Sequence, residues 1–247
     1  MKLASYVLMI LLLNACGSSL QTKRIAANNA AINNLQLGVA YMRRGQNDMA
    51  LDPLQKALNI NPNSAEAHNA IAVLYERLGK NDKAKQHYQT SLQMKPNYYD
   101  AHNNYGQYLC KNDEFAQANI HFLKAIENPM YKTPEVAYTN AGICAVRYKK
   151  LTDAETYIRK ALQSNSKFPR ALFQMASISF DQQRYQQART YLQRYSNVAK
   201  PTSKTLWFGF HIERKLNNKD AQIQYARLLR NQFPDSLETQ KLNQLEQ

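Results

Sequence analysis

Apolar and polar positions follow two different patterns along the chain. Residues 3–13 form an almost continuous apolar run, which only Ser5 and Tyr6 interrupt. Further along, apolar and small residues recur at a fixed distance, so that residues 36–63 and 70–97 carry the same residue types 34 positions apart. The matched pairs are Leu37/Ile71, Gly38/Ala72, Tyr41/Tyr75, Gly45/Gly79, Ala50/Ala84, Leu54/Tyr88, Ala57/Ser91 and Pro62/Pro96. The second pattern predicts an array of similar structural units.

A period of this length and composition is that of the tetratricopeptide repeat, a pair of antiparallel helices. Gly38 has no Cβ atom, which lets the two helices approach closely. Gly45 and Gly79 are placed to end the first helix of a repeat, where a left-handed residue is needed. Pro62 and Pro96 close the second helix.

The register predicts an all-α superhelix of about six helix-turn-helix repeats, each burying its apolar faces against its neighbours. The predicted repeats are residues 31–64, 65–98, 99–132, 135–168, 169–201 and 202–235. The connection ENPMYKTPE at residues 127–135 contains two extra residues and is expected to be irregular. Residues 236–247 are predicted to form a capping helix.

The N-terminal segment has the layout of a bacterial lipoprotein signal. The apolar run is too short to span a bilayer as a helix, which takes about 20 residues. Leu13-Asn14-Ala15-Cys16 resembles the lipobox, in which the cysteine accepts a diacylglycerol and becomes the first mature residue. We therefore expect removal of residues 1–15, lipidation and palmitate labelling at Cys16, and a tether over residues 16–30. The alternative is an ordinary cleaved signal in which Cys16 is incidental.

Charge and composition narrow the class of partner. The chain has 32 Lys and Arg against 18 Asp and Glu, spread without long basic blocks, so nucleic acid is not an expected partner. A basic surface behind a signal peptide is better suited to acidic proteins or anionic lipid headgroups. By resemblance to sorted lipoproteins, Gly17 after the cysteine favours the periplasmic face of the outer membrane.

Cys110 and Cys144 fall in the first helices of the third and fourth repeats, at nearly equivalent places. Stacking of the repeats sets these helices side by side, and an oxidising compartment favours a disulfide between them. The alternative is two buried thiols whose Cα atoms are too far apart to be bridged.

The histidines do not indicate a metal site. His68 and His102 are 34 residues apart, as are His87 and His121, and repeat duplication alone accounts for both spacings. The chain has no ligand set typical of zinc, no phosphate-binding glycine loop and no recognisable nucleophile arrangement. We expect no catalytic residues, no metal, no cofactor and no small-molecule substrate.

The concave wall of the superhelix is the expected partner-binding surface. The first-helix residues that the register assigns to it are Leu35, Val39, Met42, Asn69, Val73, Arg77, Asn103, Gln107 and Lys111. Its apolar end grades into amides and positive charge, which suits an extended peptide. Alternatively, Leu35 and Val39 pack against a preceding segment and are core residues.

Two stretches are more specific than the generic repeat. Residues 104–145, which contain the cysteine pair and ENPMYKTPE, and residues 206–236, which contain WFGFHIERKL and RNQFPDS, resemble the PilF/PilW family of type IV pilus biogenesis lipoproteins. The resemblance implies a pilotin, a lipoprotein that binds secretin subunits and promotes their outer-membrane targeting or multimerisation. An accessory lipoprotein of barrel assembly or envelope maintenance is the alternative, and an enzyme using paired His or Cys residues is a further one.

Overall fold

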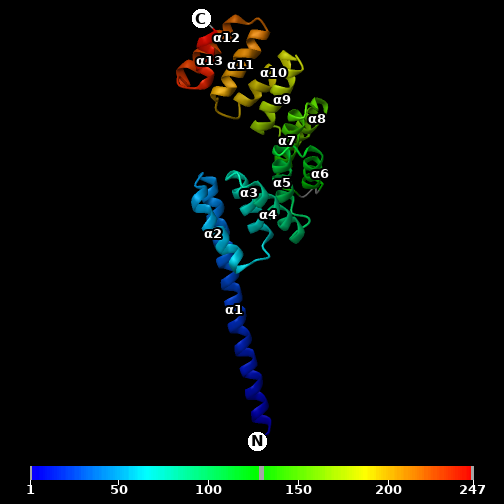
Figure 1. Cartoon of the computed structure of the whole chain (residues 1–247), viewed down its shortest axis with the longest axis vertical. Coiled ribbons are helices and arrows are strands. Elements are labelled where there is room, and N and C mark those ends of the chain that lie inside the picture. The colour runs from blue at the N-terminus through cyan, green and yellow to red at the C-terminus, as the bar shows by residue number, and fades with distance from the viewer. Residues whose placement is uncertain (1, 128–130, 246–247) are drawn as a thin grey trace. The chain divides into compact units, whose positions relative to one another are not determined.

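The structure, a computed structural model, describes residues 2–127 and 131–245, and the side chains of residues 21–127 and 131–245. Over these ranges all regular structure is α-helical (Figure 1). The helices are α1 (Lys2–Arg43), α2 (Asn47–Ile60), α3 (Ala65–Arg77), α4 (Asn81–Met94), α5 (Tyr99–Lys111), α6 (Phe115–Ile126), α7 (Pro134–Arg147), α8 (Leu151–Ser164), α9 (Pro169–Asp181), α10 (Tyr185–Ser196), α11 (Ser203–Lys215), α12 (Lys219–Gln232) and α13 (Leu237–Leu245). The predicted all-α fold of tetratricopeptide repeats is confirmed.

The helices form two compact units. Unit 1 covers residues 1–108 and unit 2 covers residues 109–247. In unit 1 the core lies between α1, α2 and α3, around Leu54, Ile71 and Leu74. In unit 2 one core cluster lies between α7, α8 and α9, and another contains Leu206 and Phe210 of α11, Leu229 of α12 and Leu242 of α13. The last helix therefore covers the apolar end of the sixth repeat.

The first helix of every repeat ends at one residue in the left-handed conformation. These residues are Gly45, Gly79, Asp113, Lys149, Gln183 and Asn217, with φ between 56° and 75°. The residue that follows donates its N–H to the carbonyl five positions earlier, as from Gln46 to Tyr41 and from Lys150 to Ala145. This hydrogen bond is typical of the Schellman motif, which satisfies a carbonyl at the helix end.

The spacing of these left-handed residues measures the repeat. Successive positions are 34 residues apart, except that Asp113 and Lys149 are 36 apart. The two extra residues therefore fall between α5 and α8, as the irregular segment 127–135 indicated. Residues 128–130 of that segment lie outside the described residues.

Helix α1 differs from the sequence-based expectation. It continues through residues 16–30, for which composition predicts a tether. The first repeat is therefore preceded by a helical extension of its own first helix. Cys16 and the lipobox lie outside the described side chains. Among the described residues, no helix combines the length and hydropathy needed to cross a membrane.

The left-handed positions predict opposite effects of glycine substitutions. Lys149→Gly and Gln183→Gly should each raise the free energy of unfolding by about 0.5–1 kcal/mol, because a side chain disfavours positive φ. Gly79→Ala should lower it by about 1 kcal/mol for the same reason. Urea denaturation would measure both effects. The control is Ala116→Gly on an exposed face of α6, which should destabilise; a similar loss for Lys149→Gly would contradict the assigned conformation.

Candidate functional site

The first repeat lies at the start of unit 1, where Leu35, Val39 and Met42 were expected to face a partner. Met42 instead belongs to the core between α1, α2 and α3, with a relative exposure of 6%. Leu35 and Val39 are half-buried and pack against the same core. Leu35 and Val39 therefore pack, but against the core between α1, α2 and α3 rather than against a preceding segment, and Met42 is buried.

The polar part of the expected wall is also less accessible than the register indicated. Asn69 and Asn103 are buried, and Asn69 accepts a hydrogen bond from Asn104 (Nδ2–Oδ1 3.3 Å). Arg77 is exposed, yet its guanidinium donates to the backbone carbonyl of Met42 (2.6 Å) and so joins the ends of α3 and α1.

The remaining positions of the expected wall differ from one another. Val73 packs against the core of unit 1, and Gln107 is half-buried. Lys111, which belongs to unit 2, is exposed. The nine positions therefore do not form one continuous open surface, because most of them contribute to helix packing.

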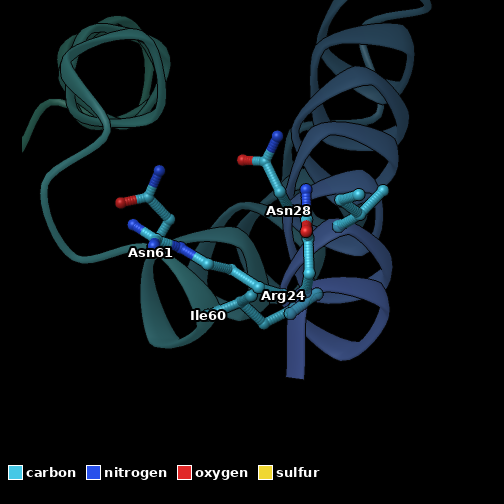
Figure 2. A pocket seen from close by; sticks show the side chains of 7 residues that line it. Arg24, Asn28, Ile60 and Asn61 are labelled. Carbon is cyan, nitrogen blue, oxygen red and sulfur yellow. The ribbon is translucent and has the colours of Figure 1, made fainter. Parts of the chain in front are cut away.

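An open cleft lies instead where α1 extends beyond the end of α2. Its volume is about 920 Å³, and it is lined by Gln21, Arg24, Ile25, Ala27, Asn28, Ile60 and Asn61. Two of its apolar side chains are well exposed, Ile25 at 54% and Ile60 at 40%. Figure 2 shows Arg24 reaching from α1 across Ile60 toward Asn61, with Asn28 above it on the same helix. The cleft therefore combines an apolar floor with a cation and amides, a combination that suits a peptide carrying both apolar and polar groups.

The sequence does not indicate this cleft, because the composition of residues 16–30 predicts a tether. One signal could have revealed it. Ile25 and Ile32 are two helical turns apart, so they lie on the same side of a continuous helix, and both are exposed in the structure. Two exposed apolar side chains on one side of a helix indicate a candidate contact surface, although Ile32 does not itself line the cleft.

The histidines make a local contact in unit 1. His68 donates from Nε2 to the carbonyl of Pro62 (3.2 Å), which leaves its Nδ1 to accept from Nδ1 of His87 (2.9 Å). Burial, with His68 and Lys83 nearby, lowers the pKa of His87 to about 4. Among the described side chains, no three His, Cys, Asp or Glu groups are placed to hold a metal ion.

The two cysteines of unit 2 join α5 to α7. Cys110 and Cys144 are both buried, and they form a disulfide with Cα atoms 5.9 Å apart. Beside them Asp113 accepts hydrogen bonds from Tyr148 (3.0 Å) and Arg147 (2.9 Å). These two hydrogen bonds, together with the positive charge of Arg147, hold the pKa of the Asp113 carboxyl below its usual value. The crosslink closes the loop that contains the irregular connection between the third and fourth repeats.

Comparison with known proteins places this repeat architecture in a family. Family models described as "TPR repeat" and "Tetratricopeptide repeat" match residues 38–79, 65–98 and 145–203. A crystal structure of PilW, described as a widely conserved type IV pilus biogenesis factor, is 30% identical with a TM-score of 0.79, over 86% of this chain and 97% of that one. This chain belongs to the PilF and PilW family.

Two further comparisons involve PilF of Pseudomonas aeruginosa. The "Type IV pilus assembly protein PilF" is 28% identical over 207 residues, which is 84% of this chain and 82% of that protein. The structure of P. aeruginosa PilF has a TM-score of 0.78 and covers 90% of this chain and all of that one. The likeness to the PilF and PilW family thus extends over most of the chain.

The disulfide leads to a prediction about stability. Purified protein should show no reaction of Cys110 and Cys144 with a thiol reagent until it is reduced. Cys110→Ser/Cys144→Ser should lose about 3–4 kcal/mol of unfolding free energy, because the crosslink lowers the conformational entropy of the unfolded chain. Thiol titration and thermal melting with and without reductant would measure this. Two titratable thiols in unreduced protein would refute the crosslink.

His87 leads to a prediction about acid sensitivity. Its folded pKa of about 4 lies below the ordinary 6.5, so the unfolded chain binds the proton first between these values. The free energy of unfolding therefore has its full value, as far as His87 is concerned, above pH 6.5, and it decreases as the pH falls toward 4. His87→Asn should therefore reduce the loss of unfolding free energy between pH 7 and 4.5 by roughly 1 kcal/mol, after allowance for solvent screening. The exposed neighbour change Gln86→Asn is the control and should leave the pH dependence unaltered.

Proposed function

We propose that this protein is an outer-membrane lipoprotein of type IV pilus biogenesis that binds secretin subunits and promotes their targeting or multimerisation. The observation that carries the proposal is the likeness over most of the chain to PilF, named a type IV pilus assembly protein, and to PilW, named a pilus biogenesis factor. Repeat arrays of this kind present surfaces to other proteins, so the role requires binding and no catalysis.

The cleft between α1 and α2 is the surface that we assign to the secretin. Its exposed isoleucines, Ile25 and Ile60, can bury apolar side chains of a partner, and Arg24 and Asn28 can bind the partner's polar groups. The half-exposed side chains of Leu35 and Val39 follow on the same helix. A partner helix or strand would therefore contact both the cleft and the first repeat.

The proposed lipid anchor supports this assignment by proximity along α1. Cys16 precedes Ile25 by nine residues of continuous helix, a distance of about 14 Å at the rise of an α-helix. Lipidation at Cys16 would hold the cleft near the membrane surface at which secretin subunits insert. Confinement to that surface raises the effective concentration of the binding site.

The test is a pair of charge substitutions in the cleft. Ile25→Asp/Ile60→Asp should abolish capture of the type IV pilus secretin from detergent extracts and reduce SDS-resistant secretin multimers at least tenfold. Folding should be unaffected, because both side chains are exposed. The matched control is Ile223→Asp, which changes a 66%-exposed isoleucine on α12 of unit 2. This variant should capture the secretin normally.

A second arm tests the anchor in the same cells. Cys16→Ala should remain an uncleaved precursor without palmitate labelling and should not fractionate with the outer membrane. Capture of barrel-assembly components without secretin by the unaltered protein would refute the secretin role. Normal secretin binding by the cleft variant would refute the cleft as its site.

A further inference from the structure

Helix α11 in unit 2 carries the chain's one tryptophan, Trp207. Lys204, Trp207, His211 and Arg214 follow one another at spacings of three and four residues, so they share one side of the helix. Leu206, Phe210 and Glu213 are buried toward neighbouring helices. The α11 surface, defined as Lys204, Trp207, His211, Arg214 and Lys215, is therefore partly or fully exposed, while the rest of the helix forms the core.

The register shows that three residues of this surface occupy wall positions of the sixth repeat. Trp207, His211 and Lys215 precede the left-handed residue Asn217 by the same numbers of residues as Asn69, Val73 and Arg77 precede Gly79. In the second repeat these positions hold a buried amide, a half-buried valine and an arginine bonded to a backbone carbonyl. In the sixth repeat they hold two aromatic rings and an exposed lysine.

The aromatic rings of the α11 surface are fixed by mutual packing. The Trp207 and His211 ring centroids are 4.3 Å apart with planes at 84°, and Phe210 stacks on Trp207 at 5.7 Å. Trp207 also packs against the cluster that contains Leu206 and Leu242. A rigid, half-buried indole can bury an apolar side chain of a partner with little loss of its own conformational freedom.

The electrostatics of the α11 surface are positive. Lys204, Arg214 and Lys215 are exposed, and the helix's one acidic residue, Glu213, is buried in an ion pair with Arg189. Burial and the charges of Arg214 and Lys215 lower the pKa of His211. The positive charge of Lys204, Arg214 and Lys215 is therefore not offset by an exposed carboxylate on the same helix.

We propose that the α11 surface is a second docking site, which binds an acidic segment of a partner protein. Carboxylates of the segment pair with Lys204, Arg214 and Lys215, and an apolar side chain between them packs on Trp207. Charge complementarity identifies the occupant as acidic. The half-buried, edge-packed indole favours a peptide side chain over insertion into lipid. The site lies in unit 2 and is independent of the proposed secretin cleft in unit 1.

Trp207 makes the site directly observable, because it is the chain's one tryptophan. The probe is a twelve-residue peptide rich in Asp and Glu with one central Phe. It should change Trp207 fluorescence saturably at micromolar concentrations, and a matched peptide with Lys in place of the acids should not. Arg214→Glu/Lys215→Glu should weaken binding at least tenfold. The control Lys124→Glu/Arg227→Glu alters exposed cations on α6 and α12 by the same total charge. Its affinity for the peptide should stay within twofold of that of the unaltered protein.

Three outcomes would overturn the proposal. Equal weakening in the two double variants would show general attraction to a basic protein. A fluorescence response to phosphatidylglycerol vesicles at concentrations at which the peptide gives none would indicate a lipid surface. No saturable response in the unaltered protein, with helical circular dichroism intact, would show that no such site exists. Secretin capture by Arg214→Glu/Lys215→Glu should remain normal. A failure of the α11 docking proposal can therefore be distinguished from a failure of the proposed secretin site in the cleft.

Discussion

The close contact between the two helices of each repeat is the constraint on which the rest of the structure depends. A Cβ atom added at Gly38 would lie 2.5 Å from the Leu54 side chain, and one at Gly142 would lie 2.6 Å from Ile158. Where the first helix has alanine instead, as at Ala72 and Ala176, the facing side chain, Tyr88 or Leu192, is also buried. A small residue on one helix and a large one on the other thus set the separation of the pair.

This contact is encoded locally, so the sequence was sufficient to predict it. The small and large residues recur at the repeat distance, and Gly45 and Gly79 correctly indicated left-handed helix ends. Asp113, Lys149, Gln183 and Asn217 take the same conformation, although they are not glycine. Asp and Asn enter this region more readily than other side chains do, whereas Lys149 and Gln183 adopt it although their side chains disfavour it. The register alone locates these four positions.

The accessibility of the first helices could not be predicted from the same register. Periodicity assigns a residue to one side of a helix, but a first helix of a repeat contacts its own partner helix and its neighbours in the stack. Met42, Asn69 and Asn103 are consequently buried on positions that a single helix would expose. Composition predicts a tether over residues 16–30, and the structure adds that this segment is helical. Gly, Ser and Asn favour a linker on average, whereas a helix that begins in the apolar run continues through them in the structure.

The distribution of charge explains why the two candidate surfaces differ in chemistry. Exposed ion pairs such as Lys56–Asp52 contribute little, and the acidic residues are too few to compensate 32 cations. Excess positive charge must therefore be balanced by solvent ions or by acidic partners. In unit 1 the cleft adds exposed isoleucines to Arg24, so apolar burial can dominate its binding. In unit 2 the α11 surface has three cations around one indole, so its binding should be the more sensitive to salt.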